Sequence, residues 1–236
     1  MFISTSTSHD EAERAATVAV LPVGSFEQHG SHLPLSTDTL IACAIARRIA
    51  ADYNLFLLPP VSLGCSHEHT GFAGSVSISS ATLAAIVGDV ASSLRTAGVE
   101  RLVVVNGHGG NYVLSNVVQE ANVEDRKMLL FPRSEDWRDA RKAAGVVTDN
   151  HEDMHGGEAE TSILLYESPD IVRSNYRKED STADDRRFML TIGMAGYTEN
   201  GIIGRPSLAT ADKGRMLLNA FSALFKEHLN LFYTDE

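Results

Sequence analysis

The sequence predicts an α/β fold of three layers, in which helices cover both faces of a mostly parallel central sheet. Two observations lead to this prediction: short apolar, β-branched segments alternate with amphipathic segments of helical length, and glycine- or proline-containing turns separate them. Parallel neighbours in a sheet need long crossovers, which such helices provide. The 236 residues fit one domain of this kind. We therefore expect a single domain over residues 1–236, with a polar leader at residues 1–16.

The first half of the chain predicts two strands and two helices. Residues 17–23 are short, β-branched and apolar on both faces, which is typical of a buried strand. Residues 38–54 carry apolar side chains at spacings of three and four behind possible capping residues, which predicts an amphipathic helix. Residues 55–58 come before two prolines and predict the next strand. Residues 80–97 predict the second helix, which Gly98 ends.

The second half continues the alternation as far as a fourth predicted strand. Residues 101–106 predict the third strand, and a glycine turn at 107–110 leads into a helix that begins near Asn111. Residues 127–131 predict the fourth strand, and beyond Pro132 the pattern loosens. The remaining segments are a surface helix at 134–145, an apolar helix or strand at 160–166, a polar stretch at 167–189 and a last amphipathic helix at about 211–232.

Charge and cysteine content exclude several classes of protein. The 20 Lys and Arg against 31 Asp and Glu give a net charge of −11, which repels phosphate backbones, so we expect no nucleic-acid partner. Cys43 and Cys65 form neither a disulfide framework nor a Cys-x-x-Cys metal site. The polar start lacks the pattern of a signal peptide, and no apolar run is long enough to cross a bilayer. We therefore expect a cytoplasmic protein with no membrane partner.

Histidines and carboxylates gather at the ends of the predicted strands. Seven of the nine histidines fall between His29 and His155, and three of these, His29, His108 and His155, lie directly beside glycines. The carboxyl ends of parallel strands meet at one edge of a sheet, where the loops converge on the ligand site. Side chains from separate clusters can therefore meet in space.

The first cluster follows the first predicted strand. Glu27, His29, His32 and Asp38 offer imidazole nitrogen and carboxylate oxygen, which suit a divalent cation. A carboxylate such as that of Asp38 can also bridge two ions. Taken alone, this cluster is interpreted about equally well as a solvated polar loop.

The second cluster, Asn106-Gly107-His108-Gly109-Gly110-Asn111, favours the metal interpretation. The alternative is an anion-binding turn at a helix N-terminus. However, the glycines are followed neither by the Lys and Ser or Thr of a phosphate loop nor by the spacing of a dinucleotide fingerprint. His108 is therefore better interpreted as a metal ligand.

The third cluster supplies His155, Glu158 and Glu160 just before an apolar segment. The two glutamates are two residues apart, so on a helix they would point to nearly opposite sides, and we expect only one of them to be a ligand. A fourth group, Ser66 to His69, is interpreted equally well as a polar loop. Cys65 beside it is expected to be a small buried residue, because nothing in the sequence indicates a lowered thiol pKa.

These clusters together resemble the creatininase (creatinine amidohydrolase) family. The resemblance runs from about Val20 to Gly214 in four ordered blocks, which makes it more specific than any single motif. It implies a binuclear metal hydrolase on a creatininase-like fold, often assembled as a hexamer. The blocks are residues 22–38, 106–111, 155–162 and 201–211.

The resemblance also implies roles for individual residues. By position, Glu27, His29, Asp38 and His108 resemble the family's metal ligands, with Asp38 as the bridge. Glu160 aligns with a family glutamate at the metal centre, and His155 aligns with a histidine expected to shuttle a proton. The implied cofactors are two divalent metal ions per chain, with Zn²⁺, Mn²⁺ or Fe²⁺ suited to nitrogen and oxygen ligands.

The sequence departs from creatinine hydrolases proper at one place. Those enzymes carry Tyr and a metal-binding Glu after the strand-end histidine, whereas this chain has Gly109 and Gly110. Creatinine is therefore disfavoured as the substrate, and Glu158 is a candidate for the missing carboxylate. The Gly-His-Gly-Gly-Asn form is similar to family members that hydrolyse a formamide of a pyrimidine nucleotide, or the precursor peptide in the mycofactocin system.

The sequence thus predicts an amidohydrolase that cleaves a non-peptide or cyclic C–N amide bond of a small molecule with a metal-activated bridging water. His155 or Glu158 would protonate the leaving nitrogen. Two alternatives stay open: a metal-dependent peptidase that processes a small precursor peptide, and a non-catalytic metal-binding scaffold. We expect a homo-oligomer. The sequence leaves open the substrate, the metal, the choice between Glu158 and Glu160 as ligand, and whether 167–189 forms a lid.

Overall fold

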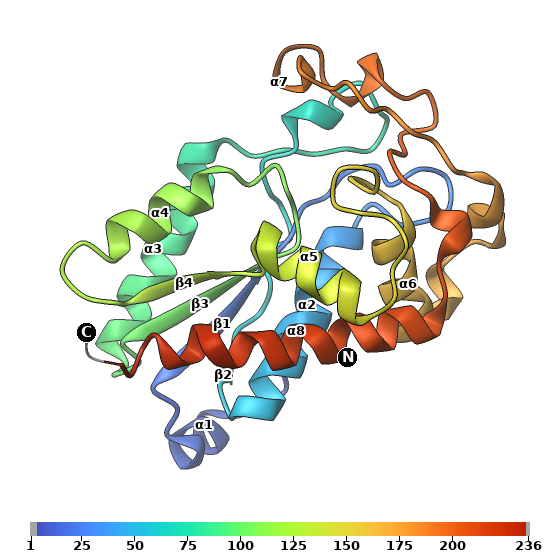
Figure 1. Ribbon diagram of the computed structural model, residues 1–236. Helices are drawn as coiled ribbons and strands as arrows, with labels where there is room; N and C mark the ends of the chain where they lie inside the picture. The colour runs from blue at the N-terminus through green and yellow to red at the C-terminus, as the bar shows by residue number, and fades with distance from the viewer. Residues whose placement is uncertain (1–3, 235–236) are drawn as a thin grey trace.

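Four parallel strands form one sheet in the order β2-β1-β3-β4 (Figure 1). The computed structural model describes residues 4–234. The two central strands pair along their full length, from Val18 opposite Arg101 to Val23 opposite Asn106, so they end at the same edge. The strands are β1 (Val18–Val23), β2 (Phe56–Leu57), β3 (Arg101–Asn106) and β4 (Met128–Phe131).

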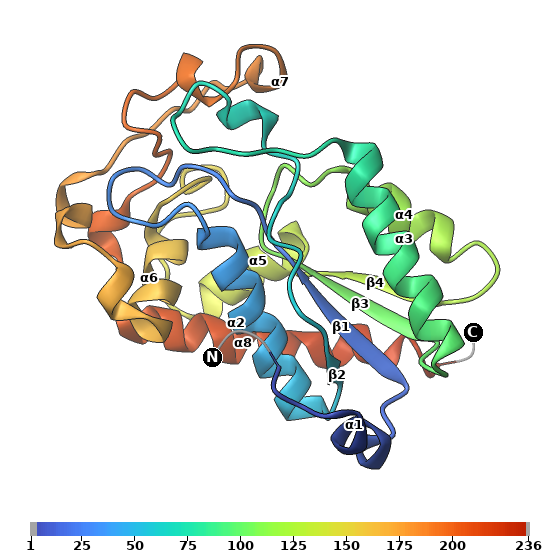
Figure 2. The same cartoon turned by 180° about the vertical axis from the view of Figure 1, so that it is seen from behind.

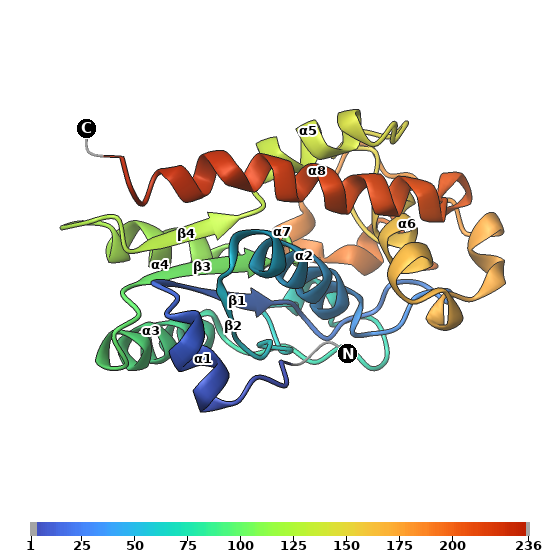
Figure 3. The same cartoon turned by 90° about the horizontal axis from the view of Figure 1, so that it is seen from below.

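Helices cover both faces of this sheet, as predicted. α3 (Ser80–Thr96) and α4 (Val113–Ala121) pack on one face, and α8 (Ala211–Asn230) runs along the other (Figures 2 and 3). Alternate residues of β1 enter opposite cores, because successive side chains of a strand point to opposite faces. The α8 face also holds α2 (Thr37–Tyr53), α5 (Ser134–Ala143) and α6 (Glu158–Glu167).

The predicted three-layer α/β class is confirmed, and the predicted strands agree with the observed ones to within about two residues. Within its described part, the expected polar leader forms α1 (Ser8–Arg14), a helix that the sequence did not predict. None of its residues is buried, so it lacks the apolar periodicity that reveals a helix; the Thr7 cap and an Arg14–Glu11 ion pair stabilise it instead. Residues 1–3 of the expected leader lie outside the described residues.

The polar stretch at 167–189 contains only short helical turns. These and the other short elements are η1 (His67–His69), η2 (Pro169–Ile171), η3 (Ser174–Lys178), α7 (Met189–Ile192), η4 (Met194–Gly196) and η5 (Pro206–Leu208). No helix among residues 4–234 combines the length and the apolar composition that a bilayer crossing requires.

The path of the chain creates a switch point between β1 and β3. From β1 the chain passes through α2 to β2 on one side, and then through α3 to β3 on the other side. Loops that leave neighbouring strands in opposite directions open a crevice at their carboxyl ends, where α/β proteins bind ligands. The loops after β1 and β3 and the start of α6 lie beyond this edge (Figure 1).

Candidate metal centre

Six of the predicted site residues meet beyond the switch point in overlapping groups of three. Within each group, among the described residues, one potential ligand atom per residue lies within 4.8 Å of the others. The two groups that share Asp38 contain all five predicted metal ligands. The groups are Glu27–Asp38–His108, His29–Asp38–Glu160 and Glu27–His29–His155.

Asp38, in the first turn of α2, stands between two imidazoles. Its Oδ1 lies 2.9 Å from Nε2 of His29, and its Oδ2 lies 3.0 Å from Nδ1 of His108. The Ser25 hydroxyl donates a 2.6 Å hydrogen bond to the same Oδ2. Burial disfavours the charged carboxylate, but the two histidines outweigh burial and hold the pKa of Asp38 well below its usual value. One carboxylate therefore offers one oxygen to each of two sites.

Backbone carbonyls fix the orientation of both imidazoles. Nδ1 of His29 lies 3.1 Å from the Glu27 carbonyl, and Nε2 of His108 lies 2.9 Å from the Cys65 carbonyl. Each of these nitrogens donates its N–H, because a carbonyl only accepts. The other nitrogen of each ring faces the carboxylates, which, despite burial, raise the pKa of His29 to about 9 and that of His108 well above its usual value. A bound ion would take the place of the proton on that nitrogen, which is the arrangement that metal-binding histidines adopt.

Glu27 supplies the evidence that the centre suits a cation. Its carboxylate is fully buried, and neither oxygen has a hydrogen-bond partner of good geometry. Nδ1 of His108 and Nε2 of His69 nevertheless lie 3.1 and 3.2 Å from Oε1. These nitrogens are close enough for ion pairs, but their angles to Oε1 are not those of a hydrogen bond. A buried carboxylate without a directed donor is costly unless a cation balances it, and the nitrogen and oxygen donors match a divalent ion.

His155 lies against the same cluster on its outer side. Its ring packs 4.1 Å from that of His29 and 4.5 Å from that of His69, centroid to centroid. Nε2 donates a 2.6 Å hydrogen bond to the Gln28 carbonyl, which leaves Nδ1 facing Glu27 at 3.8 Å. Burial and the neighbouring histidines hold the pKa of His155 well below its usual value, so the ring is neutral near pH 7.

Glu158 and Glu160 point apart, as their spacing predicts. Glu160 faces His29 and Asp38 and accepts a 2.6 Å hydrogen bond from the Gly156 amide. Burial raises the pKa of Glu160 to about 7. Glu158 belongs to none of the three groups: it pairs with Lys213 and accepts hydrogen bonds from the residue 147 and 148 amides and the Thr148 hydroxyl. Its carboxylate thus joins α6 to α8 and to the preceding loop.

The remaining sequence candidates divide between the centre and its surroundings. His32 is buried and bonds Thr161, away from the three groups, and His67 is exposed. The sequence left the role of His69 undecided. In the structure Nε2 of His69 lies beside the Glu27 carboxylate, and its Nδ1 accepts a 3.0 Å hydrogen bond from the Gln28 side-chain amide. Its one signal was its place after the second strand. Cys65 is buried, which raises the pKa of its thiol, in agreement with the expectation of an unreactive residue.

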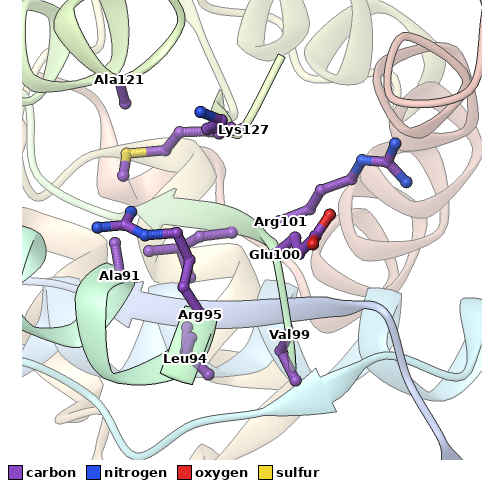
Figure 4. A pocket seen from close by; sticks show the side chains of 10 residues that line it. Ala91, Leu94, Arg95, Val99, Glu100, Arg101, Ala121 and Lys127 are labelled. Carbon is purple, nitrogen blue, oxygen red and sulfur yellow. The ribbon is translucent and has the colours of Figure 1, made fainter. Parts of the chain in front are cut away.

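A cavity of about 410 Å³ opens beside the centre at the carboxyl ends of β3 and β4. His108 and Glu160 line its inner end, and Trp137 and Arg133 lie toward α5. A smaller cavity of about 310 Å³ lies at the opposite, amino end of the sheet (Figure 4). None of the five predicted ligands lines that cavity or a larger one of about 540 Å³ beside Glu68 and Gly110, so the first one is the candidate substrate site.

The chain is similar to known proteins along most of its length. The family described as creatininase (creatinine amidohydrolase) matches residues 4–229. The chain is 38% identical over 224 residues to the mycofactocin precursor peptide peptidase of Mycolicibacterium smegmatis, covering 91% of this chain and 85% of the relative. It is 27% identical over 222 residues to the creatinine amidohydrolase of Pseudomonas putida, covering 85% and 84%. A solved mutant creatininase of the Zn-Zn type superimposes with a TM-score of 0.81 at 24% identity, covering 96% and 95%.

Proposed function

The chain belongs to the creatininase family, and from this premise we propose that it is a divalent-metal-dependent hydrolase of C–N amide bonds. The observation that supports the proposal most directly is Asp38, which presents one oxygen to His29 and the other to His108. A carboxylate shared in this way suits a centre with two ions.

The residues that would hold the two ions are those of the two groups that share Asp38. Glu27 and His108 complete one group, and His29 and Glu160 complete the other. Solved creatininases include zinc and manganese forms, and the donor set here suits either metal or Fe²⁺. When bound, such ions lower the pKa of a water and polarise the amide carbonyl.

His155 is the residue that we propose to move the proton. An amide nitrogen leaves only after protonation, so the reaction needs an acid beside the cleaved bond. The lowered pKa keeps His155 neutral, with Nε2 tied to the Gln28 carbonyl and Nδ1 free to take up a proton and deliver it. We propose a structural part for Glu158, because its hydrogen bonds with Lys213 and Thr148 already occupy its carboxylate.

Two classes of substrate follow from the proposal. The first is a small-molecule or cyclic amide, for which the cavity of about 410 Å³ has a suitable size. The second is a small precursor peptide, and one specific observation favours it: the 38% identity to a mycofactocin precursor peptide peptidase over 91% of the chain. Both reactions break the same kind of bond.

The test is hydrolysis by protein purified without chelator, then stripped and reloaded with Zn²⁺, Mn²⁺ or Fe²⁺. Lactams, formamides and short peptides are offered in parallel, and the new amine is quantified. We expect turnover that chelation abolishes and reloading restores. Preference for peptides would select the second class of substrate, and binding of two ions without turnover of any amide would instead favour a metal-binding scaffold.

We also propose that the chain works as a cytoplasmic homo-oligomer. Several large apolar side chains near α7 are exposed on the single chain, namely Phe188, Leu190 and Ile192. Exposed apolar side chains gathered in one short segment are consistent with a contact between subunits. Light scattering coupled to size exclusion measures the assembly, and a monomeric mass would contradict this part of the proposal.

A further inference from the structure

We propose that Glu68 is a positioning residue for the metal ligand His108, and that residue 110 is glycine because the His108 ring, the Cys65 carbonyl and the Glu68 carboxylate together occupy the space beside it. This inference deepens the proposed function, since it concerns how the same metal centre is held. It names a residue that the sequence left as a polar loop and that belongs to none of the three candidate ligand groups.

The two nitrogens of His108 face different surroundings. Nδ1 points inward, 3.1 Å from Glu27 and 3.0 Å from Asp38. Nε2 points outward, where the Cys65 carbonyl accepts its proton at 2.9 Å and Oε1 of Glu68 lies 3.5 Å away. The ring is therefore held between carboxylates on both sides, although only the inner pair can reach an ion.

The short helix η1 explains how one loop reaches two of the proposed ligands, His108 and Glu27. Successive side chains of a 3₁₀ helix are about 120° apart, so Glu68 and His69 point in different directions. Glu68 reaches the outer nitrogen of His108, while Nε2 of His69 lies 3.2 Å from Glu27. The loop thus contacts a histidine ligand and a carboxylate ligand from outside the centre.

Gly110 shows that this arrangement is closely packed. A Cβ atom added to Gly110 would lie within 3.0 Å of the Glu68 carboxylate and the His108 ring, and 2.7 Å from the Cys65 carbonyl. The Glu68 side chain could swing away, but the ring is fixed by its hydrogen bond and the carbonyl is backbone. Gly109 differs, because a Cβ atom there would meet nothing within 4 Å. The need for glycine is therefore specific to the position beside Glu68.

A carboxylate beside the outer N–H has a defined effect on a metal-binding imidazole. It stabilises the tautomer that leaves the inner nitrogen unprotonated, and it increases the basicity of that nitrogen. Groups that orient metal ligands in this way typically change metal affinity by about 10- to 100-fold when removed. Glu68 should therefore affect metal affinity and ligand geometry without touching the ion.

The first experiment titrates the metal-free protein with Co²⁺ and records its absorption bands, which report ligand geometry. We expect Glu68→Ala to weaken the affinity by about 10- to 100-fold and to shift the bands. Glu68→Gln keeps the shape of the side chain and loses its charge, and we expect an intermediate loss. Glu120→Gln, which removes an exposed carboxylate from α4, is the matched control and should bind like the wild type.

The second experiment compares neighbouring glycines. Gly110→Ala should weaken Co²⁺ binding and shift the bands, whereas Gly109→Ala should bind like the wild type. In Gly110→Ala/Glu68→Ala the loss should be smaller than the product of the two single losses, because the first change already displaces the carboxylate. Thermal unfolding of the metal-free variants identifies any that fail to fold, and Glu68→Gln then carries the test.

The outcomes separate this inference from the proposed function. If the wild type binds two ions and Glu68→Ala matches it in affinity and in absorption, Glu68 positions nothing and only the inference fails. If Glu68→Gln retains full affinity while Glu68→Ala loses it, the side chain acts by packing and the carboxylate assignment is overturned. A wild type that binds no metal after reloading would overturn the proposed function and, with it, this inference.

Discussion

The two ends of the sheet each carry charged residues around a cavity, but these residues are buried at one end and exposed at the other. At the carboxyl end, Glu27, Asp38 and His108 are buried, and His108 lies 3.1 Å from Glu27 and 3.0 Å from Asp38. At the amino end, Arg95 and Glu100 are exposed around an apolar floor (Figure 4). Burying charged groups is costly, so a protein keeps them buried only where they serve a purpose. Burial of the charges, more than their number, therefore marks the functional end.

The partners of the charges differ in the same way. At the amino end, the Arg101 guanidinium lies 4.9 Å from the Tyr233 ring, and Lys127 lies 3.9 Å from the exposed Glu124. Such exposed contacts contribute little to stability. At the carboxyl end, the Glu27 oxygens face imidazoles without a directed hydrogen bond. A cation would balance the Glu27 carboxylate at the carboxyl end, whereas the charged side chains at the amino end are exposed or contact neighbouring side chains.

The largest effect is expected from Asp38→Ala, which removes the carboxylate shared by both groups. We expect metal content to fall from about two ions per chain to a small fraction, and kcat/KM to fall by at least about 1000-fold. Elemental analysis and an amide assay measure the two effects. Asp212→Ala, at the exposed start of α8, is the matched control. A variant that keeps two ions would contradict the bridging assignment.

His155→Ala should separate metal binding from turnover. We expect kcat to fall by about 100-fold or more, because the proton acceptor beside the centre is lost, while two ions remain bound. The measurement is kcat together with metal content. Loss of one ion would move His155 among the ligands, as its group with Glu27 and His29 also permits.

Glu158→Gln tests the structural part of the neighbouring glutamate. Breaking its buried pair with Lys213 should lower the free energy of unfolding by about 2–3 kcal/mol at neutral pH. Hydrogen bonds outweigh burial and lower the folded-state pKa of Glu158 below the ordinary 4.5. Its contribution is thus present above about pH 4.5 and is lost as the pH falls through the folded pKa. Denaturant unfolding at neutral pH and near pH 4 should show the difference between variant and wild type shrinking; a constant difference would contradict the ionic interaction.

Arg95→Ala, at the amino-end cavity, is expected to have the smallest effect. The free energy of unfolding should change by no more than about 0.5 kcal/mol, because the side chain is exposed. Metal content and kcat/KM should equal those of the wild type. A clear loss of turnover would break the distinction between the two ends and would assign a role to the second cavity.

The fold was largely predictable because its signals are local. Apolar runs predicted all four strands, and apolar side chains at helical spacing predicted the long helices. α1 was not predicted, because none of its residues is buried and it has no apolar periodicity. The meeting of Glu27, Asp38 and His108 also followed from local reasoning, since Glu27 and His108 lie just beyond strand ends, where loops converge, and Asp38 begins the helix after the first of these loops.

The parts of the site that could not be predicted depend on contacts between distant residues. The choice between Glu158 and Glu160 as ligand depends on where α6 faces, and Lys213 on α8, which pairs with Glu158, is far away in the chain. The place of His69 depends on the turn of η1 onto the Glu27 carboxylate. Neither contact leaves a periodic pattern in the sequence. Spacing showed that the two glutamates point apart, and only the packing showed which one faces the centre.

The distribution of the ligands along the chain has a consequence for folding. Glu27 and His29 follow β1, Asp38 begins α2, His108 follows β3 and Glu160 lies in α6, so the ligands span more than half of the sequence. A binding site of such long-range contacts forms only after the sheet has assembled, because loop closure must come first. We therefore expect the metal to slow unfolding far more than it speeds folding, because the ions would bind only after the chain has folded.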